Sequence, residues 1–201
     1  MPISWQFKTV IISNDDDHVY QRRIDFHRDR YVLQAWNVIS LIRILLNEFL
    51  VEFYNSYENN ALENPYSSLI SVAKNNIEML CRMVCASVPQ FADCDGIHNG
   101  NRGMEVVDHR RLSEQEQRRE DHIHPPDWNM DCYCLIHPMF VAARSKYSPP
   151  EARKWLLKEL HYMGVHYQMR NAVAVANIVE QGGDYGPWDI YGLLGSYAFA
   201  V

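Results

Sequence analysis

The chain has 201 residues, a net charge of −6 and an apolar content of 47%, which is ordinary for a globular protein. The acidic balance argues against a nucleic-acid or anionic-membrane surface, because such surfaces are usually basic. Five cysteines without a secretory start argue against a disulfide framework and favour a reducing compartment. The longest apolar runs are far shorter than the ~20 residues of a membrane-spanning helix, so we expect a soluble intracellular protein.

Residues 1–21 form a poorly defined N-terminal segment, in which a short apolar run ends before three aspartates, Asp15 to Asp17. We interpret the run as a strand or as a loose end that covers something larger. A start of this kind suggests a piece of a longer protein, or a gene product with an arbitrary start. Residues 22–201 are expected to form one helical domain.

Residues 22–57 predict a helix, because apolar residues recur at steps of three and four. The members of this stripe are Tyr31, Ala35, Val38, Leu41, Ile42, Leu45, Leu46, Phe49, Phe53 and Tyr57. We expect this helix to be one of those that cover the next apolar segment. Residues 55–65 are polar and are typical of a loop.

Residues 67–91 predict the central helix of the fold, with a serine cap at Ser67 or Ser68 and an end at Pro89. Its uncharged stripe comprises Ile70, Ala73, Ile77, Leu80, Cys81, Val84, Cys85 and Val88. A stripe of this length has to be buried against other helices. Residues 92–127, in contrast, hold many charges and few large apolar side chains, so we interpret them as a flexible polar insertion on the surface.

Apolar sequence resumes at Trp128, and a second stripe follows at Cys132, Leu135, Ile136, Met139, Phe140 and Ala143. Pro138 predicts a kink or a late helix start. The run Ser148 to Glu151 is typical of a helix start, and Gly182 to Pro187 is typical of a turn. Because alternating β-branched runs are short throughout, the sequence predicts an all-α, multi-helix bundle with a long polar insertion.

Cysteine and histidine cluster at Cys132, Cys134 and His137, but zinc needs about four converging ligands. Two cysteines two residues apart point to nearly opposite sides of a helix, so we interpret this group as core packing. A Cys–His nucleophilic pair assembled in space stays open. Aromatic residues of the last third, Tyr162, His166, Tyr167 and Trp155, are interpreted as packing, with a small-molecule pocket as the alternative. We therefore predict no catalytic, cofactor-binding or metal-ligating residue.

Five short stretches, taken in order, resemble the C-terminal part of the fungal-specific transcription factor domain, the regulatory region of fungal zinc-cluster regulators. They are Ile44–Glu48 (ILLNE), Cys85–Phe91 (CASVPQF), Leu135–Ala143 (LIHPMFVAA), Arg153–Gly164 (R-x-W followed by L and MG) and Pro187–Phe199 (PWDIY…LGSYAF). Together they span about residues 30–201. His137 stands where the family pattern has tryptophan, which favours a packing role for that position.

The resemblance implies a helical regulatory or dimerising domain in the nucleus, with protein partners or self-association, and with a small-molecule effector as an option. The family's six-cysteine zinc cluster has no counterpart in the cysteine spacing here, so this chain is expected to lack its own DNA-binding module and family zinc. We expect no enzyme activity, no direct nucleic-acid contact and no membrane contact. The alternatives are an all-α small-molecule-binding protein or enzyme, and a non-functional fragment of a longer regulator.

Overall fold

The structure, a computed structural model, describes residues 6–13, 15–56, 66–92 and 132–194. Within these ranges the fold is all-α apart from a two-stranded sheet, as the sequence predicts. The helices are α1 (Arg30–Ser56), α2 (Ser67–Ser87), α3 (Pro89–Ala92), α6 (Ile136–Arg144), α7 (Pro150–His166), α8 (Arg170–Gln181) and α9 (Pro187–Leu194). Apart from Ala92, the predicted insertion at 92–127 lies outside the described residues, as does most of the predicted loop at 55–65.

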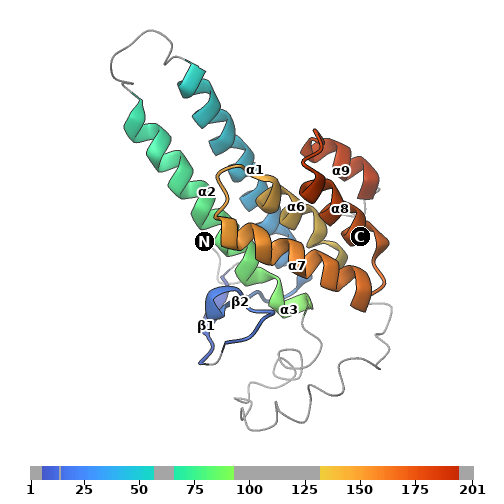
Figure 1. The fold of residues 1–201 in the computed structure, drawn as a ribbon. Helices are drawn as coiled ribbons and strands as arrows, with labels where there is room; N and C mark the ends of the chain where they lie inside the picture. The colour runs from blue at the N-terminus through green and yellow to red at the C-terminus, as the bar shows by residue number, and fades with distance from the viewer. Residues whose placement is uncertain (1–5, 14, 57–65, 93–131, 195–201) are drawn as a thin grey trace.

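Helices α1 and α2 form an antiparallel hairpin that projects beyond the other helices (Figure 1). The prediction of a helix from residue 22 is wrong at its start, because Arg23–Phe26 is strand β2, which pairs antiparallel with β1 (Lys8–Ile11). Helix α1 begins only after Asp29, whose Oδ1 accepts hydrogen bonds from the backbone N–H groups of residues 31 and 32. Such a side-chain cap satisfies donors that have no partner inside a helix.

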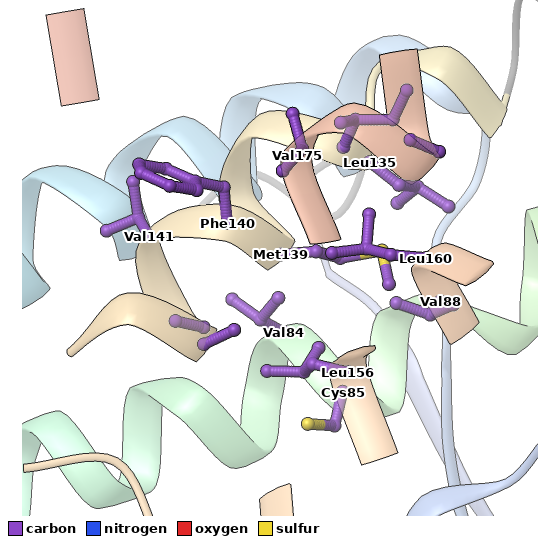
Figure 2. Close-up of a cluster of buried hydrophobic side chains, with 14 of the residues drawn as sticks. Val84, Cys85, Val88, Leu135, Met139, Phe140, Val141, Leu156, Leu160 and Val175 are labelled. Carbon is purple, nitrogen blue, oxygen red and sulfur yellow. The ribbon is translucent and has the colours of Figure 1, made fainter. Parts of the chain in front are cut away.

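The core is built around α2, as predicted, since all eight residues of its predicted stripe are buried. Figure 2 shows side chains of α2, α6, α7 and α8 interdigitating there, including Val84, Phe140, Leu156 and Val175. A second, smaller cluster of Val51, Ile70 and Ala73 stabilises the projecting part of the hairpin. The two helices of the hairpin are thus held together by a cluster of their own, in addition to their packing against the other helices, which we call the body.

The sequence signals in the last third are matched by the backbone. Pro138 lies in the first turn of α6, so the late-start prediction is confirmed. Pro150 is the first residue of α7, and Gly182 ends α8 with a φ of 66°. The guanidinium of Arg153 on α7 donates to the carbonyl oxygens of Ala143 (2.6 Å) and Arg144 (3.1 Å), and so caps the end of α6.

Gly164, on α7, leads to our first testable prediction, because α8 passes close to it. A Cβ atom at this position would lie 2.1 Å from Cγ2 of Val173. Gly164→Ala is therefore expected to destabilise the fold by about 1–3 kcal/mol, the usual cost of overpacking. Thermal unfolding of purified protein followed by circular dichroism measures this.

The matched variant is Val173→Ala combined with Gly164→Ala, in which the clashing methyl group is gone. The double variant should be less destabilised than the sum of the two single variants, since the two positions share one contact. Strict additivity would contradict the proposed steric cause.

Candidate interaction surface

The solvent-facing side of α1 is apolar, which is unusual for a surface helix. Leu46 is 57% exposed and Phe49 is 62% exposed, and the other large apolar side chains on this side are Ile39, Ile42, Leu50 and Phe53. Of the stripe predicted from the sequence, only Leu41 is fully buried among the described residues. The buried face of α1 instead uses Leu33, Asn37, Ser40, Leu41, Ile44 and Val51. Helix α1 is thus apolar on most of its circumference.

Helix α2 adds a second exposed apolar stripe beside the first. Leu69, Val72 and Met79 are each about half exposed. The side-chain amide of Asn76, between Val72 and Met79 on the helix, donates to Oδ1 of Asn47 at 3.2 Å. Because Asn47 comes three residues before Leu50 and neighbours it on the helix, this bond places the stripe of α2 beside the Leu50 edge of the α1 stripe. We call the combined surface of residues 39, 42, 46, 49, 50 and 53 on α1 and 69, 72 and 79 on α2 the hairpin face.

The hairpin face has the spacing of a coiled-coil seam. On α1, positions 39, 42, 46, 49 and 53 follow steps of three and four. On α2, the apolar residues Leu69, Val72 and Met79 fit the same spacing, with the polar Asn76 at the position between Val72 and Met79. An alternation of three and four is the heptad pattern that packs helices against helices. Fully burying one large apolar side chain contributes ~1.5–3 kcal/mol of stability. The nine side chains of the hairpin face are each about half exposed, so covering them would contribute on the order of 10 kcal/mol more.

A buried ion pair joins the N-terminal segment to α7, and the sequence reasoning missed it. Nδ1 of His18 lies 3.0 Å from both carboxylate oxygens of Glu159, whose side chain is 1% exposed. The carboxylate raises the pKa of His18 above its ordinary value. Burial raises the pKa of Glu159, although His18 acts in the opposite direction. Both shifts favour the form in which the pair holds a shared proton.

Aromatic rings and a second ion pair surround this pair. The ring of His18 packs on Tyr162 (4.3 Å between centroids), and Tyr162 stacks on His166 (4.8 Å). The indole N–H of Trp155 donates to the carbonyl of Asp17, and Lys158 pairs with the carboxylate of Asp17 at 3.1 Å. The predicted packing role of these aromatic residues agrees with the arrangement. The ion pair and the ring contact of His18 with Tyr162 attach the N-terminal segment to α7.

The cysteine and histidine group does not assemble into one cluster. Sγ of Cys132 contacts the carbonyl of Phe91 and is buried, while Nε2 of His137 donates to the carbonyl of Pro187 at 3.1 Å. Burial lowers the pKa of His137, so the imidazole is neutral and serves to join α6 to α9. In the described part of the chain, no group of three or more histidine, cysteine or acidic residues is placed to hold a metal ion.

A surface cleft of 340 Å³ lies between α1, α6, α7 and α8. Its walls carry Arg144, Lys146 and Arg153 opposite Glu48, Glu52 and Asp184. Two of the three cations are engaged within the protein, since Lys146 pairs with Glu52 at 2.5 Å and Arg153 caps α6. The volume is in the range of ligand pockets, which start at about 300 Å³. The cleft is large enough for a small polar ligand.

None of the helices in the described ranges has the length and apolarity needed to cross a membrane. Comparison of the chain with protein-family models, with curated proteins and with solved structures found no match.

Proposed function

We propose that this chain is a helical regulatory domain that works through contact, as the regulatory domain of fungal zinc-cluster transcription factors does in the family it resembles. Its role is to bind a partner on the hairpin face and so gate an attached or associated activator. The partner is an α-helical protein with its own heptad stripe of apolar residues. The same resemblance suggests the nucleus as its location.

The observation that supports this proposal is the apolar hairpin face. An exposed apolar patch beyond a few hundred Å² on a soluble protein marks a contact surface. The heptad spacing on both helices favours a helical occupant over a flat sheet or a loop. The side chains of this face are exposed, and the hairpin that carries them projects beyond the other helices (Figure 1).

Gating follows from a difference in affinity between two arrangements of the domain. A partner that binds one arrangement of the hairpin more tightly than another shifts the population toward it. The loop after α6 supplies a connection to the body, since Lys146 pairs with Glu52 and Lys74 lies 5.4 Å from the ring centroid of Tyr147. A change at the hairpin therefore reaches α6 and α7 through these contacts, in addition to the packing of α2 in the core. For a small-molecule effector, the cleft beside this connection is the position we propose.

A reporter experiment tests the proposal. The chain is placed between a constitutive DNA-binding module and an activator in a fungal host, and reporter output is compared with a fusion that lacks the chain. We expect a difference of roughly fivefold or more, the lower end of typical coupling between sites. Leu46→Glu with Phe49→Glu should abolish that difference, because two charges on the hairpin face oppose burial by a partner.

The matched control is Val165→Glu, which also places a charge at an exposed apolar helix position, 80% exposed on α7, but away from the hairpin face. This variant should behave as the unchanged chain. A cooperative thermal transition in every variant verifies that each is folded, which also tests the fragment alternative. Equal reporter output from the double variant and the unchanged chain would contradict the proposal.

A further inference from the structure

We infer that the occupant of the hairpin face is a second copy of this chain, in a two-fold dimer whose α1 helices pack antiparallel. The inference rests on the proposed function, because it names the partner for that same surface. Three properties of the face favour a second copy: its area, the small number of charges at its border and the order of residue sizes along α1.

The area matches what a stable dimer needs. The nine side chains of the hairpin face are each 40–62% exposed. Together they present on the order of 800 Å² of surface, which is about the contribution of each partner to a stable protein interface. The largest apolar patch on a typical monomer is smaller, about 300–600 Å².

Charge restricts which surfaces of this chain can face a second copy. Each copy carries a net charge of −6, so two copies repel wherever acidic surfaces meet. The residues of the hairpin face are themselves uncharged, and one charged side chain borders them, that of Arg43, which is exposed on α1 four residues after Ile39 and three before Leu46. Two of the three acidic residues on α1 and α2 are paired within the chain, Glu78 with Arg82 and Glu52 with Lys146. A second copy therefore meets this face with little electrostatic penalty.

The order of residues along α1 is complementary to itself in the antiparallel direction. The aliphatic residues Ile42 and Leu46 come first, and Phe49 and Phe53 follow. In an antiparallel pair, Ile42 faces Phe53 of the other copy and Leu46 faces Phe49. Each layer then holds one aliphatic and one aromatic side chain, so the helix spacing is uniform. A parallel pair would put phenylalanine against phenylalanine at one end and widen the gap there.

A two-fold dimer uses the same patch on both copies, and this is the commonest form of soluble homo-oligomer. Its interface would combine the α1 contact with the flanking stripe of α2, to give four helices side by side. Asn76 and Asn47 satisfy one another at 3.2 Å within each copy, so both can be covered without leaving that bond unmade.

Sedimentation and light scattering on the full chain at micromolar concentrations test the inference. We expect twice the mass of one chain for the unchanged protein and for Val165→Glu, and a monomer for Leu46→Glu with Phe49→Glu. The dissociation constant of the dimer should be higher in this double variant than in the unchanged protein by on the order of a hundredfold or more, as for substitution at an interface hot spot. A chain that is monomeric at every concentration, or a dimer whose mass is unaffected by the double variant, would overturn the inference.

Mixed variants test the antiparallel register. Leu46→Glu chains and Phe49→Lys chains should each be mainly monomeric. Their mixture should recover the dimer, because the carboxylate introduced in one chain then faces the ammonium group introduced in the other. Absence of recovery in the mixture would rule out this register.

The two experiments distinguish failure of the proposed regulatory function from failure of the proposed dimer. A monomer whose reporter output still depends on the hairpin face points to a different helical partner, and so contradicts the second copy alone. A dimer that is lost in the double variant with unchanged reporter output supports the second copy and contradicts the regulatory role.

Discussion

Replacing His18 with alanine should destabilise the fold by about 3–5 kcal/mol near neutral pH, the usual cost of removing one partner of a buried ion pair. The reason is the carboxylate left behind, since Glu159 is 1% exposed and Nδ1 of His18 contacts both of its oxygens. Denaturant unfolding at fixed pH measures the change. Adding Glu159→Gln to the alanine variant should restore much of the loss, because the unpaired charge is then gone.

The pH dependence of the unchanged protein follows from the same pair. The pKa of His18 is raised, so its contribution to stability is complete below the ordinary value of about 6.5 and is lost as pH rises through the folded value. The pKa of Glu159 is raised by burial, which gives the same sign: stability falls as pH rises through its window. Asp16, Lys158 and the ring of Tyr162 complete the surroundings of the pair.

We therefore expect the stability of the unchanged protein to decline as pH rises above about 6.5, the ordinary pKa of histidine, and the doubly substituted His18→Ala, Glu159→Gln chain to lack this component. His161 and Glu180 provide a matched control, because they form the same kind of pair at 3.1 Å but are 39% and 46% exposed. His161→Ala should leave both stability and its pH dependence within error. An equal pH slope with and without the buried pair would contradict the assignment.

The His18–Glu159 pair also illustrates what sequence reasoning could not reach. The two residues are 141 positions apart, and nothing local links them. One signal was available on α7: Glu159 lies three residues after Leu156 and four before Met163, on the apolar side of the helix. An acidic residue on a buried stripe requires a partner, but the sequence did not show which one.

Helix α2 was predictable because its polar and apolar residues separate cleanly around the helix. Helix α1 was predictable as a helix but not in its orientation, since apolar residues occupy most of its circumference. Its buried face includes two small polar residues, and Oδ1 of Asn37 accepts a hydrogen bond from Oγ of Ser87 at 3.3 Å. A rule that buries the largest apolar stripe therefore selects the wrong side. The apolar residues on the exposed side of α1, which make this rule fail, are the ones that form the hairpin face.

The start of α1 was mispredicted for a related reason. The residues before it are compatible with a helix, but positive φ angles at Gln21 (51°) and Arg22 (58°) interrupt the backbone. Pairing between β1 and β2 then uses the N–H and C=O groups of Arg23–Phe26. This pairing depends on a segment some fifteen residues earlier, so helical periodicity alone could not exclude a helix there.

Gln90 is the residue for which we expect a comparably large effect, and it lies in one of the motifs that resemble the fungal domain. Its side-chain amide binds the backbone of His27 twice: Oε1 accepts from the N–H at 2.7 Å and Nε2 donates to the carbonyl at 2.7 Å. The amide thus acts as a strand partner for the residue that follows β2. Burial lowers the pKa of His27 to about 4, in agreement with a dry environment around these bonds.

Gln90→Met keeps the length of the side chain but removes both hydrogen bonds, and leaves a buried N–H and a buried C=O without partners. We expect a loss of about 2–5 kcal/mol, seen as a fall in Tm of roughly 5–15 °C. Hydrogen exchange adds a local measurement, because the amide of His27 should lose protection more than the amides of α7. Gln181→Met, at an exposed position of α8, is the matched control and should change neither quantity. If Gln90→Met left Tm and the exchange of His27 unchanged, the amide would not be what joins α3 to the sheet, and the role inferred for this motif would be wrong.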